Sequence, residues 1–306
     1  MKLSRTALLI VVLASLLAGC SIKAAYNNFD RFARWQVSDY VDFDDRQSAY
    51  FDAEIARLLY WHRTSELPRY ATWLESLARA TEEERIEGTL DEVVREAIAA
   101  AELIEQKAMP MTVELMLSLT DAQLAELPEK MARDNQEFME EEAELELSEA
   151  QAQWLENMED ATKRFMGRLT QAQREYLKTQ SLRYQPEQKL WVEYRARWQS
   201  ELIKALAGRR DVEGFVRTYE QLIATRESFY GAEFAEVSKA NEKLRRNVTL
   251  GLLTQATDEQ RLRLVETMRD FAKDFRELKA EAEPAAPGSG GCLVRCKTAT
   301  PSGDSA

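Results

Sequence analysis

Residues 119–123 read LTDAQ, and segments of the same form return three times along the chain, as LSEAQ at 147–151, LTQAQ at 169–173 and ATDEQ at 256–260. Each has the form of a capping box, in which a Ser or Thr hydroxyl accepts from a backbone N–H one turn further on and a Gln side chain reaches back to the capping residue. Each box is expected to stabilise its helix by about 1 kcal/mol. The pattern predicts helix starts capped by Thr120 and Gln123, Ser148 and Gln151, Thr170 and Gln173, and Thr257 and Gln260.

The copies are unevenly spaced, which disfavours a solenoid array and favours antiparallel helices of unequal length. Composition agrees, because residues 20–283 hold only four prolines and are rich in Ala, Leu, Glu, Gln and Arg, which are strong helix formers. Alternating strand patterns joined by Asn-Gly or Asp-Gly turns do not occur. We predict an all-α domain over residues 26–283, an elongated multi-helix bundle. A two-lobed body divided near residues 110–120 is the alternative.

Helix boundaries follow from caps and prolines. An aromatic-rich segment covers 26–40, and a second helix is expected to end near Ser65, because the residue before Pro68 avoids the α region. Pro68 suits the first turn of a third helix. Thr89 and Glu92 have the spacing of a capping box for a fourth.

The remaining helices are predicted from a proline, a glycine and the strongest apolar stripe of the chain. Pro128 lies eight positions into its helix and predicts a short turn over 121–127 with a longer helix after it. The last helices are expected over 211–254, with a break near Gly231, and over 258–282. Apolar residues recur at every fourth position, which predicts a core-facing helix, at Leu190, Tyr194, Trp198, Leu202 and Leu206.

The first twenty residues have the order of a secretory signal. Lys2 and Arg5 precede an apolar run over 7–17 and small residues at its end. The run is too short for a spanning helix, which needs about 20 apolar residues. An ordinary secretory signal with an incidental cysteine is the alternative to the lipid anchor considered next.

The segment Leu17, Ala18, Gly19, Cys20 resembles the lipobox of bacterial lipoproteins. The resemblance implies that residues 1–19 are removed, that the Cys20 thiol carries a diacylglycerol and that the new amino terminus is acylated. Ser21, in place of Asp, favours the outer membrane by analogy with Gram-negative sorting. Residues 20–25 then form a short tether of at most about 20 Å. We predict a lipid-anchored protein of the cell envelope, on the periplasmic face of the outer membrane.

The charge balance restricts the partners. The formal net charge is −12 at pH 7, and loss of the signal makes it more negative, since that removes Lys2 and Arg5 and no acid. This balance disfavours nucleic acid and anionic head groups. Apart from the membrane that the anchor enters, the expected partners are envelope proteins or the cell wall. The glutamate-rich stretch 137–149 is interpreted as a solvated face, because a helix projects such oxygens outward instead of converging them on a cation.

The C-terminal segment 284–306 is rich in Pro, Gly and Ser, which predicts a disordered tail. It contains Cys292 and Cys296. An uninvolved tail, a local disulfide with a redox or crosslinking role, and metal binding are the alternatives for these cysteines. Two thiols with no histidine nearby make a poor zinc site.

His62 is the only histidine, so motifs that need a second histidine for a metal or for catalysis are excluded. It lies between Trp61 and Arg63, and we interpret the three as a candidate interaction cluster. A histidine near a helix end also interacts favourably with the helix dipole, and a ligand-binding or catalytic role is the alternative. Phosphate loops, Gly-x-Ser-x-Gly elbows and calcium loops do not occur. The sequence predicts no enzyme, no cofactor and no metal.

Two resemblances to known families add to this interpretation. The lipobox, Tyr26-Asn27-Asn28, the Trp61-His62-Arg63 cluster and the helix opening at 258–261 resemble an uncharacterised family of Gram-negative lipoproteins with a domain of unknown function, over residues 17 to about 283. This implies a helical envelope lipoprotein and supplies no activity.

The second resemblance is local. The LTxxQ segments at 119–123 and 169–173 are similar to a motif of the periplasmic chaperones of the Spy and CpxP type, and 147–151 is a near match. That family implies a cradle-shaped helical dimer. Two hypotheses follow: a non-catalytic protein-interaction module at the outer membrane, or a holdase that shelters unfolded chains on an exposed apolar face.

Overall fold

The computed structural model describes residues 22–143, 145–282 and 293–294. Every regular element among these residues is a helix, so the all-α prediction is confirmed. The predicted signal, with Leu17, Ala18, Gly19 and Cys20, lies outside the described residues. So does the predicted tail with Cys292 and Cys296, apart from Leu293 and Val294.

The helices follow one another as α2 (Ile22–Asn27), α3 (Phe29–Ser38), α4 (Asp45–Trp61), the π-helix η1 (His62–Glu66), α5 (Leu67–Glu82), α6 (Ile86–Ser118), α7 (Asp121–Phe138), the π-helix η2 (Met139–Ala143), α8 (Leu147–Met166), α9 (Gln171–Ser181), α10 (Gln188–Ala207), α11 (Val212–Ala224), the 3-10 helix η3 (Arg226–Phe229), α12 (Ala232–Thr254) and α13 (Asp258–Ala280).

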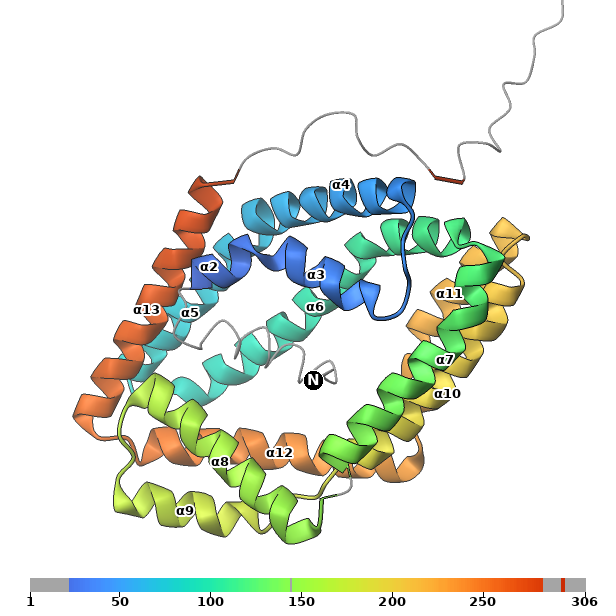
Figure 1. Cartoon of the computed structure of the whole chain (residues 1–306). Coiled ribbons are helices and arrows are strands. Elements are labelled where there is room, and N and C mark those ends of the chain that lie inside the picture. The colour runs from blue at the N-terminus through green and yellow to red at the C-terminus, as the bar shows by residue number, and fades with distance from the viewer. Residues whose placement is uncertain (1–21, 144, 283–292, 295–306) are drawn as a thin grey trace, which may run out of the picture.

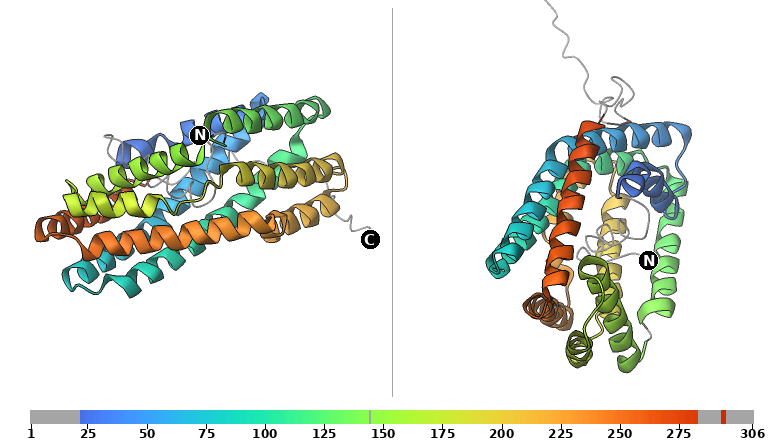
Figure 2. Two further views of the ribbon diagram at one scale, coloured as in Figure 1. Left: turned by 90° about the horizontal axis from the view of Figure 1, so that it is seen from below. Right: turned by 90° about the vertical axis from the view of Figure 1, so that its left-hand side faces the viewer.

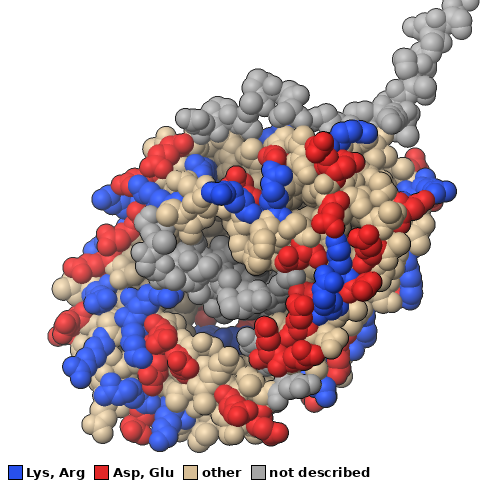
Figure 3. Space-filling view, in the orientation of Figure 1, with Lys and Arg blue, Asp and Glu red and all other residues tan. Residues whose placement is uncertain are grey.

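The helices surround a central space (Figure 1). In that view α13 and α5 form one side, α4 the top, α7, α10 and α11 the opposite side, and α8, α9 and α12 the bottom. Helix α6, about 50 Å long at 1.5 Å per residue, crosses behind, and α2 and α3 cross in front. The space-filling view shows that this face is hollowed near its middle (Figure 3). We call this closed arrangement of helices the frame. Its buried apolar side chains are divided among several clusters instead of one central core.

Helices α5 and α13 form the most extensive pair, and Figure 2 shows them side by side at one edge. Small residues allow the close approach, since Ala71, Ala78 and Ala272 are fully buried there. Two ion pairs cross the interface in antiparallel order, Arg276 with Glu75 at 2.6 Å and Arg269 with Glu82 at 2.9 Å. These pairs are exposed and contribute little compared with the apolar contacts.

The predicted stripe of α10 packs against α7 and α11. Leu202 and Leu206 are buried in this cluster together with Phe215 and Tyr219 of α11. The indole N–H of Trp198 donates to the backbone oxygen of Leu222 at 3.2 Å. The spacing of four residues therefore does define a core face, as the sequence predicts.

Pro68 and Pro128 have different effects on the helix boundaries. The segment made of α4 and η1 ends at Glu66, and α5 begins at Leu67 with Pro68 in its first turn, as the sequence predicts. In an α-helix the ring of Pro68 would clash with the carbonyl of Thr64, and the wider π-turn before it relieves that contact. By contrast, helix α7 runs through Pro128, so the predicted short turn over 121–127 is wrong.

Two starts also differ from prediction. Helix α6 begins at Ile86, three residues before the expected cap at Thr89, and extends through Pro110 to Ser118. Helix α2 begins at Ile22, which is buried, so most of the predicted tether over 20–25 is helical and packed against the body. The solvated face expected over 137–149 is found at the glutamates whose exposure the structure describes, Glu137, Glu140, Glu141, Glu146 and Glu149.

Candidate functional site

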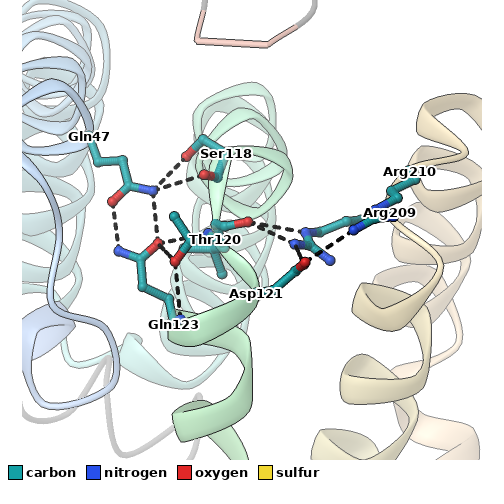
Figure 4. A network of polar contacts seen from close by, with 8 residues as sticks. Gln47, Ser118, Thr120, Asp121, Gln123, Arg209 and Arg210 are labelled. Atoms are coloured by element: carbon teal, nitrogen blue, oxygen red, sulfur yellow. Dashed lines mark hydrogen bonds and ion pairs between the residues drawn. The ribbon is translucent and has the colours of Figure 1, made fainter.

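The capping boxes are joined in pairs by their glutamines. Thr120 caps α7 and accepts from the Gln123 N–H at 3.2 Å, while the Gln123 Oε1 accepts from the Thr120 N–H at 2.9 Å. The start of α4 carries a second box made by Asp44 and Gln47. Figure 4 shows the Gln47 and Gln123 side chains facing each other, with each Nε2 donating to the other's Oε1, at 3.2 and 2.8 Å.

We call such a pair of capping glutamines, each donating to the other, a glutamine clasp. Each amide of this first clasp, Gln47 with Gln123, also bonds to a backbone oxygen across the interface. Gln47 Nε2 donates to the Ser118 backbone oxygen at 3.0 Å, and Gln123 Nε2 donates to that of Asp42 at 2.6 Å. Each oxygen thus accepts from its own cap N–H and from its partner's amide, and each nitrogen donates to its partner's oxygen and to a backbone oxygen. Gln47 Nε2 also lies 3.2 Å from the Ser118 hydroxyl. A glutamine side chain offers these donors and acceptors and no net charge, so the pair can be buried at little cost.

A second clasp repeats the arrangement at the starts of α9 and α13. Thr170 and Thr257 are the caps, and Gln173 and Gln260 donate to each other at 2.9 Å in both directions. Gln173 Nε2 also reaches the backbone oxygen of Gln255 at 3.3 Å, and Gln260 Nε2 reaches that of Arg168 at 2.9 Å. Both glutamines are buried. The clasp therefore fastens helices that lie 87 residues apart.

The cap predicted at Ser148 is wrong. Helix α8 begins at Leu147 with Glu146 as its N-cap, and Glu149 closes that box. Glu146 and Glu149 have the same spacing as Ser148 and Gln151, and the structure uses the earlier pair. Gln151 instead donates from the side of α8 to the backbone oxygens of Leu182 and Tyr184, at 3.0 and 3.2 Å.

Sequence reasoning missed the box at Asp44 and Gln47, although its signal is present as Asp-x-x-Gln directly after an acidic break. It could not have found the pairing, which depends on tertiary contact. A further link appears in Figure 4, where Asp121 pairs with Arg209 at 2.6 Å and with Arg210 at 3.1 Å. Hydrogen bonding from Arg209 lowers the pKa of the Asp121 carboxyl.

The predicted cluster of Trp61, His62 and Arg63 lies where α4 passes into η1. His62 Nδ1 is 2.7 Å from the Tyr26 hydroxyl, and the two rings stack with centroids 5.7 Å apart. Tyr70 meets the His62 ring edge-on at 5.5 Å. The histidine is therefore enclosed between the first described helix and α5.

Burial sets the protonation of this group. It lowers the pKa of His62 to about 4 and raises the pKa of the Tyr26 phenol. At neutral pH both groups are therefore uncharged, and one of them donates to the other across the 2.7 Å contact between the Tyr26 hydroxyl and Nδ1. His62 is thus a neutral hydrogen-bond partner that orients Tyr26.

Arg63 fastens the same helix from the other side. Its Nη2 donates to the Asn27 Oδ1 at 2.7 Å, and its guanidinium lies 5.0 Å from the centre of the Tyr26 ring. Both contacts, together with the His62 bond, hold the end of α2 to the body. His62 and Arg63 therefore serve an internal contact, in which Nδ1 of His62 is already engaged.

Trp61 meets the His62 ring edge-on, with centroids 6.3 Å apart, and also lines a pocket of about 240 Å³ between α4 and α6. Lys107 lies with its ammonium 5.6 Å from the centre of a Trp61 ring. The pocket is lined by Glu54, Arg57, Leu58, Trp61, Lys107, Ala108 and Met111. The three residues of the predicted cluster thus have different roles: Trp61 lines a pocket, whereas His62 and Arg63 hold α2.

Across the described ranges, no group of three or more His, Cys, Asp and Glu is placed to hold a metal ion. Over the same residues, no helix is both long enough and apolar enough to cross a membrane.

These features define the class of protein: an all-helical domain whose helix starts are clasped in pairs by capping glutamines and whose one histidine holds its first described helix. The sequence model of DUF6279, a family of unknown function, matches residues 39–235. The chain belongs to this family, which confirms the predicted membership of an uncharacterised family. Neither the search of curated proteins nor the search of solved structures found a match.

Proposed function

We propose that the protein is a lipoprotein on the periplasmic face of the outer membrane and that its helical body is a non-catalytic protein-interaction module. The observation that carries the proposal is the attachment of α2. Ile22 and Tyr26 are buried against α5 and α13, and Ile22 is only two residues after the predicted lipidation site at Cys20. A lipid at that position would hold the whole body against the membrane without a flexible linker.

The interaction role is supported by how the predicted site residues are used. His62 and Arg63 hold α2, and the clasp glutamines Gln47, Gln173 and Gln260 are buried in bonds to other helices. These side chains build a frame. The surface that the frame presents is then available for envelope proteins or the cell wall.

The alternative is a holdase of the Spy and CpxP type. Such a chaperone needs a contiguous exposed apolar surface of several hundred Å². The large exposed hydrophobic residues are distributed over α3, α6, α8, the end of α9 and α13, at Phe32, Trp35, Val94, Ile98, Leu147, Leu182 and Leu262. Their distribution over several helices, and the interhelical bonds that hold the motif glutamines Gln123 and Gln173, favour the interaction module.

The anchor is tested by fractionation and mass spectrometry of the wild type and Cys20→Ala, each expressed with residues 1–306. The wild type is expected in the outer-membrane fraction with the mass of a triacylated chain that begins at Cys20, and Cys20→Ala in a soluble fraction. Equal membrane association of both would contradict the anchor.

The two activities are separated by a second experiment. The chain from residue 21, without lipid, is titrated into a denaturing client protein beside an inert protein of similar charge. The interaction module predicts no suppression of aggregation, and crosslinking in intact envelopes should then capture a discrete partner. Protection near stoichiometric ratio would replace the module with the holdase.

A further inference from the structure

Helix α3 exposes a row of aromatic side chains. Phe29, Phe32 and Trp35 follow at intervals of three residues, with ring centroids 6.3 Å and 5.8 Å apart along the row. Phe29 is half-buried, while Phe32 is 48 % exposed and Trp35 is 59 % exposed. Two large aromatic groups in contact at the surface form an amphipathic patch that water does not favour.

The opposite side of α3 is already engaged. Ala33 and Val37, one turn apart, pack against the cluster that contains Phe51 and Ile55 of α4. Arg34 also forms an ion pair with Asp52 of α4. The helix is thus fixed to the body by one face, so the aromatic row is held outward and does not complete the core.

The row lies close to the proposed anchor. Ile22 is buried at the start of α2, and Lys23 forms ion pairs with Glu277 and Glu281 at the end of α13. The Cα atom of Cys20 can be no more than about 8 Å from that of Ile22. At 1.5 Å per helical residue, Trp35 lies within roughly 20 Å of Ile22.

Figure 1 shows α2 and α3 crossing the same face of the frame. Where α3 crosses it, the surface in Figure 3 is formed mainly by uncharged side chains, with both basic and acidic groups beside them. Asp30 and Arg31 are both exposed on α3 itself. Aromatic rings with neighbouring basic groups are the composition of a helix that lies in a membrane interface, where the rings enter the boundary between head groups and acyl chains and the arginine reaches phosphate.

We propose that α3 is a membrane-contact helix, whose Phe32 and Trp35 side chains enter the surface of the phospholipid leaflet that holds the Cys20 lipid. The inference rests on the proposed lipid anchor, and it adds an orientation. The acyl chains hold one point of the body at the bilayer, and the aromatic row supplies a second point. Two points fix the face crossed by α2 and α3 towards the membrane.

The first test uses the lipidated full-length product reconstituted into phosphatidylcholine vesicles that carry bromine on their acyl chains. Bromine quenches only tryptophans that enter the bilayer. The wild type is expected to be quenched, and Trp35→Phe to lose most of the quenchable fraction. Quenching that is the same with and without Trp35 would overturn the proposal.

The second test removes the anchor. The unlipidated chain from residue 21 is sedimented with phosphatidylcholine vesicles as the wild type, as Phe32→Ser/Trp35→Ser, and as Leu262→Ser. Leu262 is the matched control, because it is 60 % exposed on α13. The vesicle partition coefficient of the double variant should be at least about tenfold lower than that of the wild type, since two aromatic side chains lose their apolar contact. The partition coefficient of the Leu262→Ser control should equal that of the wild type.

The outcomes separate the two proposals. A Cys20 without lipid mass contradicts the anchor but leaves vesicle partition of the unlipidated chain as a direct test of α3. A lipidated Cys20 with no effect of the double variant on partition contradicts α3 alone. If the double variant abolishes self-association of the wild type instead of vesicle binding, the row covers a second copy and the membrane-contact helix is overturned.

Discussion

Gln173 illustrates how a single residue type serves two purposes. Its oxygen accepts from the N–H of Thr170, which closes a local capping box, and from Gln260, which lies on another helix. Its nitrogen donates to Gln260 and to the backbone of Gln255. Glutamine is suited to this position because one amide can satisfy all four bonds. A glutamate at the same place would close the box but would meet the Gln260 and Gln255 oxygens with negative charge.

Gln173→Ala is expected to lower the free energy of unfolding by about 2–4 kcal/mol. The substitution removes the two bonds between Gln173 and the buried Gln260 amide and the partner of the Thr170 N–H, and each group left unsatisfied costs roughly 1–3 kcal/mol. Urea denaturation followed by circular dichroism measures the effect. Gln136→Ala, at an exposed position of α7, is the control and should stay within about 0.5 kcal/mol of the wild type. An equally small effect of Gln173→Ala would show that the clasp carries no stability.

His62 should make stability depend on pH in a defined window. Burial lowers its pKa to about 4 in the folded protein, while the unfolded value is about 6.5. Between these values the unfolded state binds more protons, so the free energy of unfolding falls as the pH drops from about 6.5 towards 4, by roughly 2–3 kcal/mol. Above pH 7 the residue contributes no further change.

Since His62 is the only histidine, His62→Phe should flatten the profile between pH 5 and 7. Denaturant midpoints measured across that range provide the test. A profile that keeps its slope in His62→Phe would assign the dependence to other groups.

At the level of single helices, proline and glycine have effects that depend on the neighbouring element. Pro128 lies inside α7, whereas Pro68 lies in the first turn of α5, directly after the π-helix η1. Gly88 and Gly251 both lie within helices, yet their surroundings differ. A Cβ at Gly88 would have no atom within 4 Å, whereas one at Gly251 would lie 2.2 Å from the Tyr176 hydroxyl of α9.

The two glycines therefore predict opposite responses to alanine. Gly88→Ala should stabilise the protein by about 0.5–1 kcal/mol, because alanine loses less backbone entropy in a helix. Gly251→Ala should destabilise it by roughly 1–3 kcal/mol, because Tyr176 must move and give up its 3.2 Å bond to the Asn247 backbone oxygen. Thermal unfolding of the matched pair measures both, and a stabilised Gly251→Ala would show that α9 and α12 do not approach so closely.

In the molecule as a whole, contacts between distant parts of the chain close the frame. The clasps join α4 to α7 and α9 to α13, and α2 returns to the end of α13. Arg246 of α12 adds ion pairs to Glu87 and Asp91 at the start of α6. Leu293 and Val294 reach the cluster between α4 and α6, where the Val294 N–H donates to the buried Glu114 carboxylate.

Leu293 is thus expected to stabilise the frame from the far end of the chain. Leu293→Ser should lower the free energy of unfolding by about 1–2 kcal/mol, since a buried leucine loses its apolar contacts. Leu182→Ser is the control, because Leu182 is 69 % exposed, and it should have almost no effect. Equal midpoints for both variants in urea would contradict the docking of residues 293–294.

The sequence by itself determined the helical class, the apolar face of α10 and the family. It also marked the helix starts at Thr120, Thr170 and Thr257, because a capping box is made by residues three apart and depends on local geometry alone. Of the two proline signals, Pro68 lies in the first turn of a new helix as expected, whereas the stop expected at Pro128 was wrong, because α7 continues through it.

Only the tertiary structure decided which helix starts face each other. The pairing of Gln47 with Gln123 and of Gln173 with Gln260 depends on chain segments 76 and 87 residues apart, and no local pattern encodes such a distance. The same holds for His62, whose sequence neighbours suggested an interaction site and whose actual partner is Tyr26 on another helix. Local propensity selects helices, whereas burial of polar groups, which must find partners wherever the fold brings them, selects their arrangement.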